Sequence, residues 1–364
     1  MKKITQAILF VMFAFIGTSC YGEDEKIDTN TLTSNLPILI YDSTTALQMF
    51  KHAQEIIDTT KIIVPAGSRP IKLIDIVKET LRNNHELNLG LKKLNKDQQT
   101  KLTTEKIRDA HIAYWELVYA RVKLAIRQQS LALGVDILRE NMIRYKYRDL
   151  ITIDLYEAQV AVKFRDIQVV EAQLDLDNAM DVLRKIVSID RDRPDWEVPL
   201  VPIDPPRFVD VDIDETLSLK FALEYDPYVK KARIEEIRSN HLPIKVRAAK
   251  NEEDRVIYAI RKCVRSIENL KRRVLCAKEL VEAKRAYLRK QEISHNQGVT
   301  TSVDLLNTQS EYSQAQLYEI RTVIDYFLAH VKLECVQGTI IFSQGINWKL
   351  YHPFIPDNEL MKKN

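Results

Sequence analysis

The residues of this chain that could do chemistry are scattered and form no recognisable catalytic motif. It has seven histidines, and no two stand at the i, i+4 spacing with which a helix presents two imidazoles to one metal ion. The sequence has no phosphate-binding loop and no nucleophile elbow. Carboxylates are plentiful, but the sequence pattern brings no pair of them together for acid–base work. We therefore expect no enzyme activity, no cofactor and no metal.

The cysteines other than Cys20 are also unsuited to chemistry. Cys263 and Cys276 lie 13 residues apart on one expected helix, about 20 Å along its axis, which is too far for a disulfide. Neither they nor Cys335 has a cysteine or histidine at metal-ligand spacing. We expect all three to act as small apolar packing residues.

The N-terminus has the pattern of an export signal. Two lysines follow the first methionine, residues 4–16 are mostly apolar, and small residues follow. The apolar run is shorter than the roughly 20 residues that a transmembrane helix needs. Cys20 resembles the acylated residue of a bacterial lipoprotein box, although Gly17 stands where that box usually has leucine. We predict an export signal over 1–19 and a lipid on Cys20; the alternative is ordinary signal-peptidase cleavage after Ser19 or Gly22.

Helices must position whatever site the chain has. Eight glycines in 364 residues are too few for a structure rich in tight turns. Apolar residues instead recur every three or four positions over 110–145 and again over 155–186, as in the seam of a coiled coil. Each such helix would be about 60 Å long. Gln128 and Arg165 interrupt these seams. They could line a water-filled tunnel or fix the register, but we favour an ordinary structural position for both, in which Arg165 can turn outward.

The pattern returns at a constant offset of 150 residues, which indicates a duplicated chain. Asp154-Leu155 recurs as Asp304-Leu305, and Leu183 recurs as Leu333. Each repeat is expected to hold one shorter helix and two long ones. The fold class is therefore all-α, made of duplicated long antiparallel helical hairpins with little or no β-structure.

The repeats set the expected domain boundaries. An N-terminal extension over 20–69 follows the export signal, and a C-terminal tail over 339–364 follows the last helix. Five prolines mark an extended linker between the repeats. The two helical repeats are predicted at 70–190 and 214–338, and the linker between them at 191–213.

Each long pair needs a turn. In the second repeat Gly298 is expected to end one helix in a left-handed conformation, and Thr301 or Ser302 to cap the next. The first repeat has Arg148 in place of this glycine, and Asp149 or Thr152 could provide its cap.

The ordered set of these motifs resembles the TolC-type outer-membrane efflux proteins over residues 70–340. The turn motifs and the repeat order carry most of the resemblance. The matching segments are Ile71–Leu73, Asn83–Leu87, Ala113–Leu117, Gln297–Gln309 and Leu333–Gly338.

The resemblance implies a trimer whose helices form a periplasmic tunnel continuous with an outer-membrane barrel. In that family the barrel strands are inserted between the first helix and the long pair of each repeat. At these places the chain has only residues 88–109 and 244–262, and each segment carries nine charges. A charge facing lipid at mid-membrane costs about 2–4 kcal/mol. We therefore expect a relative that kept the helical part and lacks the membrane strands.

The predicted function is that of a periplasmic or outer-membrane component of a tripartite efflux or type I secretion system, forming a trimeric conduit. The resemblance implies a periplasmic adaptor and an inner-membrane pump as partners, in a homotrimer or in a mixed trimer with a full-length paralogue. The expected location is the periplasm or outer membrane, through a lipid anchor. With a net charge of +3, nucleic acid is not expected as a partner. The alternative is a lipid-anchored helical scaffold or assembly partner that forms no pore.

The resemblance also implies candidate residues at the periplasmic entrance, where the helical turns converge. Asp304 matches a ring aspartate of the family's constriction, and Asp154 is its repeat equivalent. The family's second carboxylate is Asn307 here, the basic residue of its latch is Thr300, and the aromatic partner of the latch is His295. These five are our candidates for the constriction. The alternative is that the two aspartates only cap their helices.

Overall fold

The computed structural model describes residues 65–147, 152–192, 196–206 and 208–343. All of them belong to one compact unit, Ser43–Asn364. The expected export signal and Cys20 lie outside the described residues.

The first repeat consists of a short strand followed by two short and two long helices. These are β1 (Arg69–Ile71), α4 (Leu73–Asn83), α5 (His85–Lys93), α6 (Lys96–Lys146) and α7 (Thr152–Val187). The second repeat has the same order and a final short helix: β2 (Leu200–Pro202), α8 (Glu215–Tyr225), α9 (Pro227–Arg238), α10 (Pro243–Asn296), α11 (Ser302–Gln337) and α12 (Ile340–Ser343). The prediction of two long helical hairpins is confirmed.

Each repeat begins with two short helices, so our expectation of one was wrong. The break comes from a side chain that caps the second helix. Asn84 accepts a hydrogen bond from the Leu87 amide, and Asp226 accepts from the amides of Tyr228 and Val229. Pro227, at the first position of α9, lacks the amide hydrogen that would continue α8.

The first helix of each long pair is longer than the sequence seam indicated. α6 has 51 residues and α10 has 54, or about 76 and 81 Å at the standard helical rise. Residues 88–109 lie almost entirely in α5 and α6, and residues 244–262 lie in α10. The expectation that neither segment forms strands is therefore confirmed.

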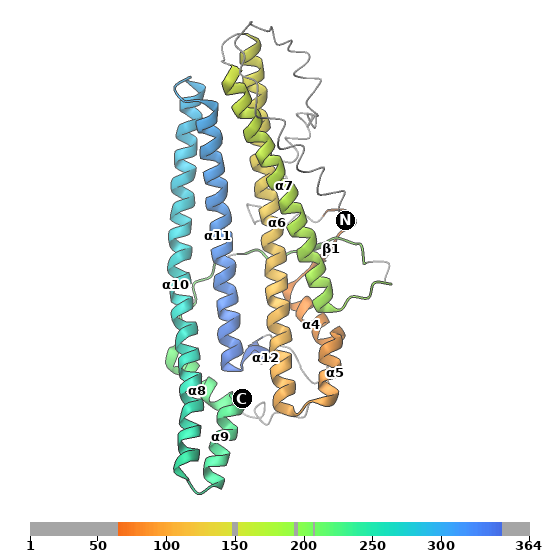
Figure 1. Ribbon diagram of the computed structural model, residues 1–364, viewed down its shortest axis with the longest axis vertical. Coiled ribbons are helices and arrows are strands. Elements are labelled where there is room, and N and C mark those ends of the chain that lie inside the picture. Colours follow the sequence, from red (N-terminus) through yellow and green to blue (C-terminus); the bar gives the residue numbers. More distant parts are fainter. Residues whose placement is uncertain (1–64, 148–151, 193–195, 207, 344–364) are drawn as a thin grey trace, which may run out of the picture. The chain divides into compact units, whose positions relative to one another are not determined.

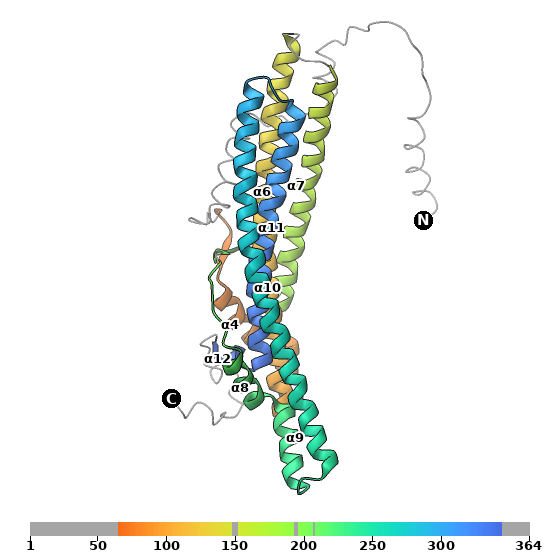
Figure 2. The same ribbon diagram turned by 90° about the vertical axis from the view of Figure 1, so that its left-hand side faces the viewer.

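The four long helices lie side by side in the order α10, α11, α6, α7 (Figure 1). Figure 2 shows the same row from its α10 side. α6 and α11 are therefore central, and α7 and α10 form the two edges. This order determines which helical faces have a neighbour within one chain.

The linker is fastened to the first repeat. β2 pairs in parallel with β1, with Arg69 opposite Leu200. The Asp204 carboxylate accepts hydrogen bonds from the Tyr114 hydroxyl (2.6 Å) and the Leu73 amide (2.7 Å). Burial and this carboxylate raise the pKa of Tyr114. The extended linker is thus held against α4 and α6.

The largest buried cluster surrounds Trp115. Its ring lies 4.9 Å from that of Phe327 on α11 and 5.7 Å from that of Tyr114. These contacts confirm a packing role for Trp115. The prediction for the cysteines holds for Cys263, which is buried, but is wrong for Cys276, which is exposed on the edge helix α10. Cys335 is half-buried.

Candidate functional site at the helical tips

Two helical turns are expected at the candidate entrance, and the structure describes the one between α10 and α11 in full. Gly298 has φ of +72°, and the Val299 amide donates to the Ser294 carbonyl at 2.9 Å, as in a Schellman motif. A Cβ on Gly298 would meet no atom within 4 Å, so the need for glycine is conformational rather than steric. The predicted left-handed end of the helix is confirmed.

Thr301 caps the following helix. Its hydroxyl oxygen accepts from the Asp304 amide at 3.1 Å, and Asp304 Oδ2 in turn accepts from the Thr301 hydroxyl at 2.7 Å and its amide at 3.3 Å. This reciprocal pair is a capping box. Asp304 nevertheless remains exposed to solvent. Its capping role is therefore a feature of the structure, and its role in a constriction stays a prediction.

His295 lies at one end of a buried polar chain that joins the two hairpins. It is 5% exposed, and its Nε2 lies 3.0 Å from the Ser302 hydroxyl oxygen. Ser302 donates to Asn141 Oδ1 at 2.7 Å. Because the single hydroxyl proton of Ser302 goes to Asn141, the proton between His295 and Ser302 must come from the ring. We assign it to His295 Nε2. The chain thus connects the end of α10, the start of α11 and α6.

Asn141 was not among the residues that sequence reasoning selected. The seam followed Leu138 and Met142, whereas Asn141 shares the adjacent helical stripe with Ile137, four residues earlier. Ile137 packs with Leu305 and Leu306 of α11. A polar residue following an apolar one on this second stripe was the signal that could have identified Asn141.

The other candidates are placed apart from this chain. Thr300 is half-buried beside the turn, and Asn307 is exposed one turn after Asp304. Asp154 is half-buried in the first turn of α7, where the helix dipole favours a carboxylate. The structure therefore brings His295, Thr300 and Asp304 around one turn and places Asp154 on the other hairpin.

Arg165 lies between the hairpins, below their tips. It is 5% exposed and donates to the carbonyl of Ala161 (2.9 Å), the hydroxyl of Ser130 on α6 (3.3 Å) and the carbonyl of Leu306 on α11. The absent side chain of Gly134 makes room for it, since a Cβ there would lie 3.2 Å from Arg165 Cδ.

Burial lowers the pKa of Arg165 to about 10, and the nearby charge of Arg127 acts in the same direction. The possibility that Arg165 turns outward is therefore wrong. Instead its side chain fixes α7 against α6 and α11, which is the register role named above as an alternative.

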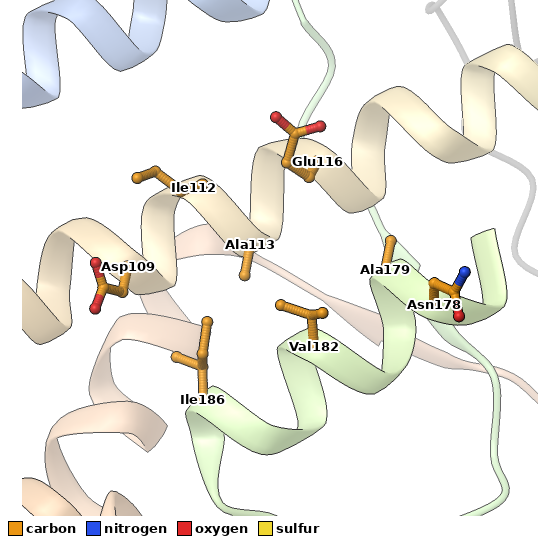
Figure 3. Close-up of a pocket in the computed structure, with 8 residues that line it drawn as sticks. All are labelled: Asp109, Ile112, Ala113, Glu116, Asn178, Ala179, Val182 and Ile186. Carbon is orange, nitrogen blue, oxygen red and sulfur yellow. The ribbon is translucent and has the colours of Figure 1, made fainter. Parts of the chain in front are cut away.

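A shallow groove of about 380 Å³ lies between the other ends of α6 and α7 (Figure 3). Val182 and Ile186 of α7 point toward Ala113 of α6 and form an apolar floor. The carboxylates of Asp109 and Glu116 line it as well. Without a nucleophile or a basic group in its lining, the groove offers no arrangement for catalysis.

Within the described residues, His, Cys, Asp and Glu side chains form no group of three that could hold a metal ion. In the same ranges no helix is both long enough and apolar enough to cross a bilayer.

Sequence comparison gives no relative: no model of a protein family matches the chain, and neither does any curated protein. Solved structures do match. A membrane protein from Pseudomonas aeruginosa has a TM-score of 0.54 at 12% identity, over 72% of this chain and 73% of that one. The outer membrane channel CmeC of Campylobacter jejuni gives 0.51 at 12% identity, over 72% and 68%.

The outer membrane protein VceC of Vibrio cholerae gives a TM-score of 0.50 at 11% identity, over 73% of this chain and 74% of that one. At such low identity the likeness concerns the fold and not the activity. The chain has the helical fold of the TolC-type outer-membrane channels.

Proposed function

We propose that this chain is an exported component of an efflux or secretion system and that three copies assemble side by side into a helical conduit. The observation that carries the proposal is an exposed apolar stripe on the edge helix α7. Its members recur mainly every three or four residues and so share one helical face. The α7 stripe consists of Ile153, Tyr156, Val160, Phe164, Ile167, Val170, Leu174 and Val182, which are 42–70% exposed.

In the second repeat, the equivalent helical face is covered by a neighbouring helix. Leu317 and Ile324 of α11 are the repeat equivalents of Ile167 and Leu174. The α11 pair is 7% and 0% exposed, whereas the α7 pair is 56% and 60% exposed. Leu317 is buried against Val122 and Ile126 of α6. Among the described residues the equivalent face of α7 has no such neighbour, and a second copy would supply one.

The other edge helix, α10, has the features of that neighbour. Leu280, Tyr287 and Ile293 are 42%, 47% and 58% exposed and stand seven and six residues apart. α10 carries fifteen Lys or Arg against seven Asp or Glu, whereas α7 carries seven Asp or Glu against four Lys or Arg. The two edges are therefore complementary in charge, which favours α7 of one copy against α10 of the next.

The heights of the two edges also match. Arg165 of α7 is level with Leu306 of α11, to which it donates. The ion pair of Lys284 with Glu311 (2.6 Å) places residue 289 of α10 at that same level, because α10 and α11 are antiparallel. In a ring whose axis follows the helices, Val160 would meet Ile293, Ile167 would meet Tyr287, and Leu174 would meet Leu280. Such head-to-tail contacts close into a ring when the rotation from copy to copy completes a full turn.

At the entrance of this ring, each copy would present its helical tips to the axis. Asp304 is exposed even in its cap, so three copies of it, with Asp154, would concentrate negative charge and favour cations. Asn307 and Thr300 add no charge there. The latch of the resembled family would be replaced by the buried chain of His295, Ser302 and Asn141. This chain joins hairpins within one copy and would stiffen the tip rather than open it.

The adaptor, the pump and the lipid on Cys20 belong to this proposal as its partners and its anchor. Deleting the gene should raise accumulation of a dye that the system exports. The wild-type gene should restore export, and the Val160→Ser/Ile167→Ser/Leu174→Ser variant should not. Unchanged accumulation of every pump substrate tried would count against the proposal.

The second candidate is a lipid-anchored scaffold that forms no pore. It is favoured by the helical structure of residues 88–109 and 244–262, the places where the resembled family inserts its membrane strands. Conductance of the purified protein in planar bilayers separates the two candidates, since reproducible single channels would eliminate the scaffold. A pull-down with a full-length paralogue would reveal a mixed trimer.

A further inference from the structure

α9 and the beginning of α10 form a hairpin at the end of α10 that lies opposite the helical tips (Figures 1 and 2). We name residues 227–250 the distal hairpin. In α10, the first residue to be buried is Ala249. The end of the distal hairpin therefore contributes little to the core of the bundle.

Large apolar side chains are exposed at this end. Ile237 is 66% exposed, Leu242 is 53% exposed and Ile244 is 75% exposed. Between them Asn240 and His241 have φ of +52° and +58°, so two successive residues other than glycine adopt the left-handed conformation. Such backbone strain is retained where the surrounding structure holds it, often at functional segments. Three large apolar side chains are thus exposed at and beside this turn.

The charge around these groups is mostly of one sign. The distal hairpin contains seven Lys or Arg against two Glu. Both carboxylates have partners within the hairpin: Glu235 pairs with Lys245 at 2.9 Å, and Glu236 lies 3.1 Å from the His241 ring. Further basic residues are exposed around the apolar end: Lys230, Lys231, Arg233, Arg238, Arg247 and Lys250.

The hairpin is held in shape by contacts between its two helices. Arg233 pairs with Glu253 at 2.7 Å, and Arg255 pairs with Asp226, the cap of α9, at 2.8 Å. The apolar end is therefore presented on paired helices rather than on a loose loop, which reduces the entropy lost on binding.

We propose that the distal hairpin docks on the surface of an anionic phospholipid bilayer. Ile237, Leu242 and Ile244 would enter the boundary between headgroups and acyl chains, while the surrounding Lys and Arg side chains bind lipid phosphates. A lipid surface fits better than a protein groove because the exposed apolar groups lie at the end of a helical hairpin whose charge is mostly positive. This inference is independent of the conduit, since it concerns residues outside both edge contacts.

A probe at the tip tests the proposal in the full-length chain. Cys20→Ala removes any acyl group, and Cys276→Ser removes the exposed native thiol. Burial raises the pKa of Cys263 and raises that of Cys335 to about 12, which slows their labelling. An environment-sensitive dye is then placed on Ile244→Cys or, as the control, on Val299→Cys at the opposite end of α10, where the native side chain is 74% exposed.

Vesicles of phosphatidylglycerol and phosphatidylcholine in equal parts should shift the dye emission to the blue at position 244 and leave it unchanged at 299. The shift should weaken in high salt and with phosphatidylcholine alone. Ile237→Ser/Leu242→Ser should lower the vesicle affinity by about tenfold or more, because apolar burial contributes most of such binding. The matched variant Val209→Ser/Val211→Ser, whose side chains are 60% and 48% exposed outside the distal hairpin, should leave the affinity unchanged.

Three results would overturn the proposal. The first is no shift at 244 with anionic vesicles, and the second is an equal shift at both positions. The third is a shift that rises with protein concentration in the absence of lipid, which would assign the tip to a contact between protein chains. Failure of the conduit would change none of these readings, because a single copy suffices for the measurement.

Discussion

α7 and α11 are the same helix of the two repeats, each 36 residues long, but their surroundings differ. α11 lies between α10 and α6 and buries fifteen residues, whereas the edge helix α7 buries eight. Among the described residues 302–337, Tyr318 is the one large apolar side chain that is largely exposed, while α7 exposes eight. Position in the row, more than sequence pattern, decides which face of a repeat is covered.

The comparison extends to the polar residues. Beyond Ser302 at its first position, buried hydroxyls of α11 donate within the helix: Ser313 to the Gln309 carbonyl at 2.9 Å and Thr322 to the Tyr318 carbonyl at 2.7 Å. α7 instead sends the guanidinium of Arg165 across to α6 and α11. Beyond its first turn, α11 thus satisfies its buried hydroxyls locally, whereas α7 places a buried cation between two neighbouring helices.

The largest expected effect concerns assembly. Val160→Ser/Ile167→Ser/Leu174→Ser should leave the protein monomeric, since losing three buried apolar side chains weakens association by about 5 kcal/mol. Sedimentation velocity would measure the oligomeric state of the variant. Val209→Ser/Val211→Ser/Leu217→Ser is the matched control, with side chains that are 60%, 48% and 47% exposed away from the α7 stripe. An unchanged sedimentation profile in the stripe variant would show that the exposed face of α7 does not hold the copies together.

The next effect compares one repeat position in two helices. Ile324→Ala should lower the free energy of unfolding by about 2–5 kcal/mol, because its side chain is fully buried. Its equivalent Leu174→Ala should change that of the monomer by less than about 0.5 kcal/mol. Urea unfolding of both variants, in a background that prevents assembly, gives the difference. Equal losses would mean that α7 is as enclosed as α11.

A smaller effect follows from the lowered pKa of Arg165. Its value of about 10 lies below the ordinary 12.5, so the unfolded chain binds more protons between these pH values. The cost of the buried cation is therefore fully present below pH 10 and is relieved as the pH rises. Between about pH 9 and 11 the stability of the wild type relative to Arg165→Met should rise by about 1 kcal/mol. A flat difference would show that Arg165 is solvated.

The smallest effect concerns the tip. Thr301→Ala removes one half of the capping box and should cost about 1 kcal/mol in thermal or urea unfolding. Asp304→Asn keeps a hydrogen-bond acceptor at the third position of α11 and should lower the free energy of unfolding by less. If Asp304→Asn cost more than Thr301→Ala, the carboxylate would have a stabilising role beyond the cap.

The sequence predicted those parts of the molecule that depend on local pattern. The 150-residue offset gave the two hairpins, and Gly298 and Thr301 gave the turn between α10 and α11. The break at Asn84 was not predicted, because one side chain that caps a helix can be read as part of it. The buried network at Asn141 and the α7 stripe depend on which helices become neighbours, and a single seam per helix does not reveal a second face.

One measurement tests the central claim, the contact of α7 with α10 of another copy, most directly. Ile167→Cys and Tyr287→Cys are combined with Cys20→Ala and Cys276→Ser, and the oxidised protein is run on a denaturing gel. The account predicts disulfide-linked dimers and a trimer as the largest species, while either cysteine alone gives no trimer. Monomer alone, or a ladder that continues beyond the trimer, would contradict a closed ring of three.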